Sequence, residues 1–264
     1  MISPLTCRTQ VRRHTPVGGC DSVTSMRGAA VLNVRGLGRR YGEFDALRGL
    51  DLTVAAGECV AVIGHNGSGK TTAVRLIAGL LEPSSGDVQI VARSIHDEAE
   101  ATDARAALAA VPDTPSLYDD LTVREHLQLV AIAHGVAGED GIEQRITQLL
   151  EQLGMASKAD ARPGALSRGM RQKLQLACAL VRPHRLLMLD EPVVGLDPAS
   201  QRTLQQLLLE AKGNGVAVVL TTHQLAFARG IADRAVVLAD GVVVADGPYD
   251  EVVDGPLVRE YGLL

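Results

Sequence analysis

The sequence predicts an α/β protein in which a mostly parallel sheet is covered by helices on both faces. Short, continuous apolar runs are typical of strands buried on both faces, and they occur at residues 58–63, 185–189 and 216–221. Apolar residues at helical spacing separate these runs, at residues 71–81, 169–181 and 200–212. Strands that alternate with helices form parallel sheets, so the two patterns together predict the fold class.

The other strand-like segments are shorter and more polar. They are expected at residues 31–34, 50–54, 86–91, 235–238 and 242–245. Asp240-Gly241 lies between the last two segments, and Asp-Gly in that position is typical of a tight β-hairpin.

The middle of the chain is rich in helical patterns. Residues 123–133 and 142–153 have helical spacing, whereas the Ala-rich residues 99–110 fit either a helix or a strand. We therefore expect a helical lobe, at about residues 95–165, inserted into the α/β domain.

The two ends of the chain are expected to lie outside that domain. Residues 1–28 show no periodicity, are rich in Ser, Thr, Gly, Pro and Arg, and are predicted to be a disordered extension rather than a secretory signal. One domain is expected over residues 29–254, with a C-terminal tail at residues 255–264. The four cysteines form no metal-ligand spacing and are expected to be reduced thiols in a cytosolic protein.

Composition excludes several classes of function. The formal net charge is −5, and the 264 residues include four Tyr, two Phe and no Trp. A nucleic-acid platform uses basic and aromatic surface, so no nucleic-acid partner is expected. No apolar run approaches the roughly 18–20 residues of a membrane-spanning helix, so this chain is not expected to cross a bilayer by itself.

A glycine-rich segment carries the strongest functional signal. It follows the apolar run 58–63, precedes a predicted helix and reads Gly64-His65-Asn66-Gly67-Ser68-Gly69-Lys70-Thr71-Thr72. This matches the phosphate-binding pattern G-x-x-x-x-G-K-[ST] in the strand–helix context that the pattern requires. Glycines let backbone N–H groups turn toward phosphate oxygens, the lysine contacts the β- and γ-phosphates, and the Thr71 hydroxyl ligates Mg²⁺. The alternative is a chance glycine-rich turn.

Two adjacent acids follow the second buried strand. Asp190 and Glu191 come directly after Leu189, at a strand end where ligands bind in open parallel sheets. Asp190 is expected to hold Mg²⁺ through water, and Glu191 to polarise the attacking water. Without the glycine-rich segment, the same acids would fit an ordinary solvated strand end.

A third motif connects these patterns to a family. Leu166-Ser167-Arg168-Gly169-Met170 precedes the strand that ends in Asp190, and it resembles the LSGGQ signature of the nucleotide-binding subunits of ABC transporters. The resemblance covers residues 31 to about 253. It implies a P-loop cassette with an N-terminal antiparallel β part and an inserted helical lobe. It also implies that the Ser167, Arg168 and Gly169 segment binds the γ-phosphate held by an opposite subunit.

The resemblance implies roles for three further residues. Tyr41 matches the aromatic residue that stacks on adenine, and His223 matches the switch histidine that touches the γ-phosphate. Asp113 stands where the family commonly has a Gln ligand to Mg²⁺, and its carboxylate is also a ligand for hard cations. Gly195-Leu196-Asp197-Pro198 is similar to the loop that passes between subunits.

These resemblances imply an ATP- and Mg²⁺-dependent ATPase, expected as a head-to-tail homodimer or heterodimer. Its partner would be a separate membrane permease, and it would be located at the inner face of the cell membrane. The direction of transport is expected to be export. Three alternatives stay open from the sequence: a non-transport ABC ATPase, a P-loop kinase, and a regulatory module that binds nucleotide without hydrolysing it.

Overall fold

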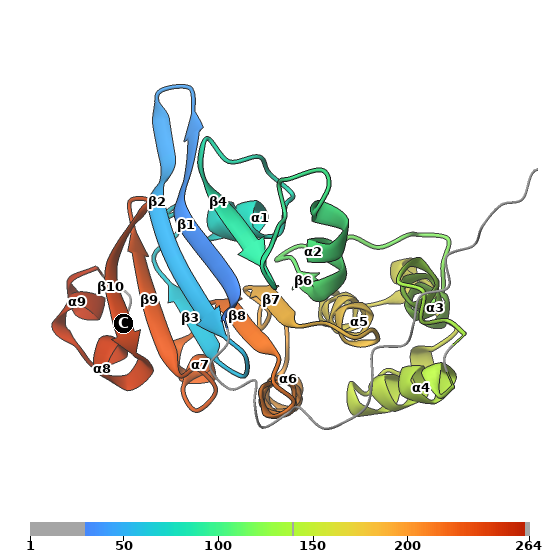
Figure 1. Cartoon of the computed structure of the whole chain (residues 1–264). Helices are drawn as coiled ribbons and strands as arrows, with labels where there is room; N and C mark the ends of the chain where they lie inside the picture. Colours follow the sequence, from blue (N-terminus) through green and yellow to red (C-terminus); the bar gives the residue numbers. More distant parts are fainter. Residues whose placement is uncertain (1–29, 139, 262–264) are drawn as a thin grey trace, which may run out of the picture.

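The computed structural model describes residues 30–138 and 140–261, in two sheets flanked by helices (Figure 1). The predicted disordered extension, residues 1–28, lies outside the described residues. In chain order the strands are β1 (Ala30–Tyr41), β2 (Phe44–Ala55), β3 (Cys59–Ile63), β4 (Ser85–Ile90), β5 (Arg93–Ser94), β6 (Leu108–Val111), β7 (Leu186–Asp190), β8 (Ala217–Thr221), β9 (Arg234–Ala239) and β10 (Val242–Pro248).

The helices lie between and after these strands. The α-helices are α1 (Lys70–Ile77), α2 (Ala101–Ala107), α3 (Val123–Ala133), α4 (Ile142–Gln152), α5 (Arg168–Leu180), α6 (Pro198–Gly213), α7 (Leu225–Ala228), α8 (Tyr249–Val253) and α9 (Pro256–Glu260). Two short 3₁₀ turns, η1 (Ala156–Lys158) and η2 (Pro163–Ala165), precede α5.

The larger sheet has the strand order β10-β9-β3-β8-β7-β6. Its neighbours from β9 to β6 are parallel, and β10 is antiparallel at one edge. The smaller sheet, β2-β1-β4-β5, is antiparallel throughout. These observations confirm the mostly parallel sheet and the N-terminal antiparallel part.

Alternate side chains of the larger sheet enter two separate cores. In β3, Cys59, Ala61 and Ile63 share a core with α5 and α6. Val60 and Val62 share the other core with α1 and the antiparallel sheet. Because both faces of the strand are buried, the apolar run needs no polar alternation, and the prediction of covered faces is confirmed.

Several element boundaries differ from the prediction. The first strand is longer than residues 31–34, and α1 ends at Ile77 instead of residue 81. Gly79 follows α1 with a φ of 66°, and a Cβ atom there would lie 2.9 Å from Ile95. The helix therefore ends where only glycine fits the left-handed backbone.

The expected extent of the helical lobe needs correction. Within residues 95–165, the Ala-rich stretch forms α2 and then β6, which pairs with β7 at the edge of the larger sheet. The first helix after β6 is α3. The expected C-terminal tail likewise contains α9, where Val258 is buried in the core.

The predicted hairpin joins β9 to β10 and lies against the glycine-rich loop. Both turn residues have positive φ, 47° at Asp240 and 78° at Gly241, as a type I′ turn requires. The Gly241 N–H donates to the Ser68 carbonyl oxygen over 3.0 Å, and the Gly241 carbonyl accepts from Arg48 N–H.

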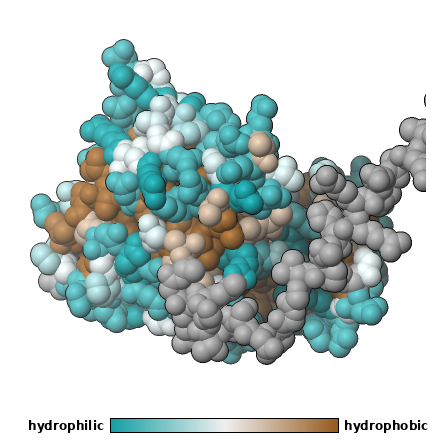
Figure 2. Space-filling model, viewed as in Figure 1, coloured by the Kyte–Doolittle hydropathy of each residue, from teal (hydrophilic) through white to brown (hydrophobic). Residues whose placement is uncertain are grey.

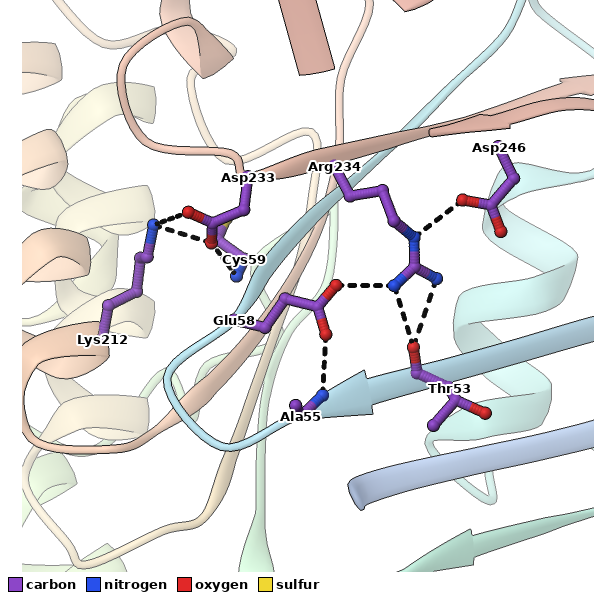
Figure 3. A network of polar contacts seen from close by, with 8 residues as sticks. All are labelled: Thr53, Ala55, Glu58, Cys59, Lys212, Asp233, Arg234 and Asp246. Atoms are coloured by element: carbon purple, nitrogen blue, oxygen red, sulfur yellow. Dashed lines mark hydrogen bonds and ion pairs between the residues drawn. The ribbon is translucent and has the colours of Figure 1, made fainter. Parts of the chain in front are cut away.

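A polar network joins the two sheets at the other end of β3 (Figure 3). The Arg234 guanidinium contacts the Asp246 and Glu58 carboxylates and the Thr53 carbonyl oxygen of β2. Next to it, Asp233 accepts from the Cys59 N–H and pairs with Lys212 at 2.8 Å. The network therefore connects β2, β3, β9, β10 and α6.

The surface of the described part is largely hydrophilic on the face that Figure 2 shows, with hydrophobic residues gathered near β10. Val242 and Val243 of that strand are partly exposed. None of the helices within residues 30–138 and 140–261 has the length and apolar character needed to span a membrane.

Candidate functional site

The glycine-rich loop connects the carboxyl end of β3 to the first residue of α1. Gly67 and Gly69 have φ values of 85° and 106°, which favour glycine. A Cβ atom at Gly69 would lie 2.7 Å from the Ala46 carbonyl oxygen, and one at Gly64 would lie 2.4 Å from that of Leu238. The loop therefore passes too close to β2 and β9 for any side chain at these two positions.

Lys70 is buried inside this loop. Only 7% of the residue is exposed, and its Nζ donates to the Gly64 carbonyl oxygen at 2.7 Å and to that of His65 at 3.1 Å. Burial lowers the pKa of Lys70, while the carboxylates of Glu191 and Asp190 raise it. The loop thus holds an ammonium group close to two acids.

Two other loop residues have distinct surroundings. Ser68 is fully buried, and its Oγ has no hydrogen-bond partner among the described residues. His65 contacts the β9–β10 hairpin, with Nε2 lying 3.8 Å from the Asp240 carboxylate.

Asp190 ends β7 beside the loop and is 2% exposed. Burial raises the pKa of this carboxyl, whereas hydrogen bonds from the hydroxyls of Thr221 and Thr71 lower it. The neighbouring charges of Asp113 and Glu191 raise it as well. Two hydroxyls from different elements therefore stabilise a carboxylate that its surroundings otherwise disfavour.

Glu191 leaves β7 in a strained backbone conformation, with a φ of 47°. Its N–H donates to the carbonyl oxygen and to the Oγ1 of Thr221, at 3.2 and 3.0 Å. Its carboxylate Oε2 lies 2.9 Å from Nδ1 of His223 and accepts the His223 N–H at 3.3 Å. The predicted catalytic pair, Glu191 and His223, is thus in direct contact.

A cavity of about 420 Å³ brings most of the predicted site together. The predicted residues that line it are Tyr41, Asn66, Gly67, Gly69, Lys70, Thr71, Thr72, Asp113 and Glu191. Gly64, His65 and Ser68 belong to the loop that forms its wall. Asp190 lies behind the lining, bonded to Thr71.

Two lining residues were missed by the sequence analysis, Phe44 and Ala46. Phe44 pairs with Tyr41 where β1 turns into β2, and it is 62% exposed. Its signal in the sequence was rarity, since the chain has only two Phe and this one lies three residues after the predicted aromatic.

The segment Ser167–Gly169 does not line this cavity. Ser167 caps α5 and accepts the Met170 N–H at 3.3 Å, with Ser167 and Arg168 exposed. Gly169 lies against the loop before α6, because a Cβ atom there would be 2.5 Å from the Gly195 carbonyl oxygen. Within one chain, the start of α5 and the cavity around Lys70 are separate surfaces.

Comparisons with known proteins agree with this arrangement. The family described as "ABC transporter" matches residues 47–194. The ABC-type transporter ATP-binding protein EcsA of Bacillus subtilis is 34% identical over 223 residues, which cover 84% of this chain and 89% of EcsA. The Nod factor export ATP-binding protein I of Ralstonia nicotianae is 35% identical over 223 residues, which cover 84% of this chain and 68% of that protein.

Solved structures of two cassettes are also similar. A structure described as the ATP binding subunit of an ABC transporter has a TM-score of 0.79 and 36% identity, with 88% of this chain and 94% of that chain covered. The dimeric bacterial ABC transporter cassette MJ0796 has a TM-score of 0.76 and 28% identity, covering 83% of this chain and 98% of that chain. The fold, the site and these similarities together show that this chain belongs to the ABC transporter family as an ATP-binding subunit.

Proposed function

We propose that this subunit hydrolyses ATP in the cavity around Lys70 and thereby drives transport through a separate membrane permease. The observation that carries the proposal is the convergence of a buried lysine, a buried aspartate and a histidine-bound glutamate on one cavity. Lys70 follows the carboxyl end of β3, and Asp190 and Glu191 lie at the carboxyl end of β7, with only β8 between the two strands. The carboxyl ends of strands are where open parallel sheets bind their ligands.

The loop and α1 are suited to a triphosphate. The tightly turned glycine backbone and the Lys70 ammonium supply the donors, and the start of α1 adds partial positive charge. Lys70 now bonds to carbonyl oxygens of its own loop, so phosphate oxygens would replace those acceptors. Tyr41 and Phe44, which line the same cavity, offer aromatic faces for the base.

The same cavity has the ligands that Mg²⁺ prefers. The Thr71 hydroxyl already bonds to the Asp190 carboxylate, so both oxygens meet at one point. Across the described residues, no cluster of three or more His, Cys, Asp or Glu side chains is suited to hold a metal alone. A site of one hydroxyl and one carboxylate suits Mg²⁺, which takes its other ligands from phosphates and water and there neutralises phosphate charge. Asp113 faces the same cavity and would act through a water.

Glu191 is the group best placed to accept a proton from the attacking water. It lines the cavity, and the contact with His223 fixes the orientation of its carboxylate. His223 would then sense the γ-phosphate from the end of β8. The strained backbone of Glu191 fits a residue whose position matters more than its local stability.

A second ATPase subunit would complete each site. Ser167, Arg168 and Gly169 start a capped helix on an exposed surface away from the cavity, where they can face a nucleotide held by another chain. The dimeric structure of the similar cassette MJ0796 supports a pair of subunits. A homodimer is the simplest arrangement because this chain carries both half-sites, and a heterodimer would use the same surfaces.

Export is the direction of transport that the relatives support. Several proteins 32–35% identical to this chain are named Nod factor export ATP-binding protein I. The subunit would work at the inner face of the cell membrane, bound to its permease.

Substitution of Glu191 tests the proposed hydrolysis. With MgATP, we expect Glu191→Gln to lower the rate of phosphate release at least about 100-fold while ATP binding persists. Light scattering should then detect a nucleotide-bound dimer. Glu210→Gln, on the exposed face of α6, is the control and should behave as the wild type. Unchanged turnover in Glu191→Gln would contradict the assignment of Glu191 as the proton acceptor. If the wild-type protein binds ATP but releases no phosphate, the chain is a regulatory module instead of an ATPase.

A further inference from the structure

The two faces of the Tyr41 ring have different surroundings. Tyr41 lines the cavity that contains Lys70 and is 46% exposed. The Arg39 guanidinium carbon lies 4.7 Å from the centroid of the Tyr41 ring. Arg39 does not line that cavity; it lines a separate hollow with Ser84 and Ser85. The guanidinium therefore covers the ring from the side that faces away from the cavity.

The position of Arg39 is fixed independently of the ring. Arg39 lies two residues before Tyr41 on β1, and its side chain is held by a contact outside that strand. The Arg39 Nη1 donates to the Glu82 carbonyl oxygen at 2.8 Å, and its Nε is buried. Glu82 lies between α1 and β4, so the guanidinium is anchored to the loop that connects these two elements.

We propose that Arg39 is a positioning residue for the nucleotide base, an inference that rests on the proposed function. A cation over an aromatic face is attracted by the ring, so Arg39 holds the exposed Tyr41 side chain in one orientation. The opposite face stays open toward the cavity, where the planar base of ATP can stack on it. Because the ring is already ordered, stacking costs less side-chain entropy than on a free tyrosine.

The affinities for ATP and for inorganic tripolyphosphate, each measured with Mg²⁺, distinguish the contribution of the base to binding from that of the phosphates. We expect Arg39→Gln to weaken ATP binding by about two- to fivefold and leave tripolyphosphate binding unchanged. Arg39→Lys should restore part of the loss, since an ammonium can also lie over the ring. The KM for ATP should rise in Arg39→Gln while kcat stays the same.

Arg40→Gln is the matched control. Arg40 lines the same hollow as Arg39 but pairs with Asp45 at 3.6 Å, so its loss removes the same charge and leaves the contact between Arg39 and Tyr41 in place. Equal weakening of ATP and tripolyphosphate in Arg39→Gln, or unchanged ATP binding, would overturn the inference.

A separate variant identifies failure of the underlying site. Tyr41→Ala should remove the difference in affinity between ATP and tripolyphosphate. If Tyr41→Ala removes that difference but Arg39→Gln does not, only the role of Arg39 is wrong. If neither variant changes it, the base does not stack on Tyr41 and the proposed site itself is wrong.

Discussion

At Asp190, burial and hydrogen bonding act in opposite directions on one carboxyl group. Burial raises its pKa, and hydroxyls on β8 and α1 lower it. Thr221 does more than donate to Asp190, because its Oγ1 also accepts the N–H of the strained Glu191. One buried hydroxyl thus supports both acids of the site.

Replacing Thr221 with Val should therefore change the pH dependence of the ATPase. Without the hydroxyl, the pKa of Asp190 rises further, so the carboxyl stays protonated up to a higher pH. The acid limb of the rate against pH should shift toward higher pH. The free energy of unfolding should fall by about 1–3 kcal/mol because a buried hydrogen-bond partner is lost. A pH–rate profile and urea unfolding measure the two effects.

Thr222→Val is the control for that prediction. Thr222 is also fully buried, and its Oγ1 accepts the Gln224 N–H at 2.9 Å without contacting Asp190. It should lose stability to a similar degree and keep the wild-type pH profile. A shift of equal size in both variants would mean that general loosening, and not the carboxyl at Asp190, moves the profile.

Among the elements, those with continuous patterns were predictable and those set by packing were not. The buried strand before the loop, the loop itself and the two acids at the end of β7 follow from local sequence. The length of the first strand was underestimated, because register shifts between Val34 and Arg39 break the alternation of its buried and exposed side chains. β6 is four residues long and Ala-rich, so only its pairing with β7 distinguishes it from a helix.

The site shows the same limit. Lys70 and Asp190 lie in motifs that the sequence displays, but the contact between Glu191 and His223 joins residues 32 positions apart. The place of Phe44 in the cavity depends on how β1 turns into β2. Neither the burial of Ser68 nor the cover of Tyr41 by Arg39 has a local sequence pattern.

The start of α5 offers a prediction at the scale of an element. Gly169→Ala would place a methyl group against the Gly195 carbonyl oxygen and displace either the helix start or the loop after Glu191. We expect ATP hydrolysis to fall at least about tenfold while a single chain still binds ATP normally. The reason is that the start of α5 lies outside the cavity and, in the proposed dimer, would act on the nucleotide of the other subunit. Steady-state phosphate release tests the expected loss of hydrolysis, and equilibrium binding of ATP tests the expected unchanged affinity.

Gly164→Ala provides the comparison for that variant. Gly164 lies in η2, just before α5, and nothing lies within 4 Å of a Cβ atom placed there. It should hydrolyse ATP as the wild type does. Loss of ATP binding in Gly169→Ala would show instead that the start of α5 supports the cavity of its own chain.

At the scale of the whole molecule, the two sheets meet at both ends of β3. At the carboxyl end, the glycine-rich loop lies against β2 and the β9–β10 hairpin. At the amino end, the sheets are linked by the network of charged groups around Arg234, which is drawn in Figure 3. Stability and nucleotide binding should therefore be separable, because the two junctions lie at opposite ends of one strand.

Arg234→Gln should lower the free energy of unfolding by about 2 kcal/mol and leave the Kd for ATP unchanged. Its side chain is 25% exposed, and its removal leaves the Glu58 carboxylate and the Thr53 carbonyl oxygen without this donor. Urea unfolding and ATP titration are the measurements. Arg229→Gln removes a half-exposed arginine paired with Asp254, and it should destabilise the protein less because solvent screens that pair. A weaker affinity for ATP in Arg234→Gln would mean that strain at the amino end of β3 reaches the phosphate loop.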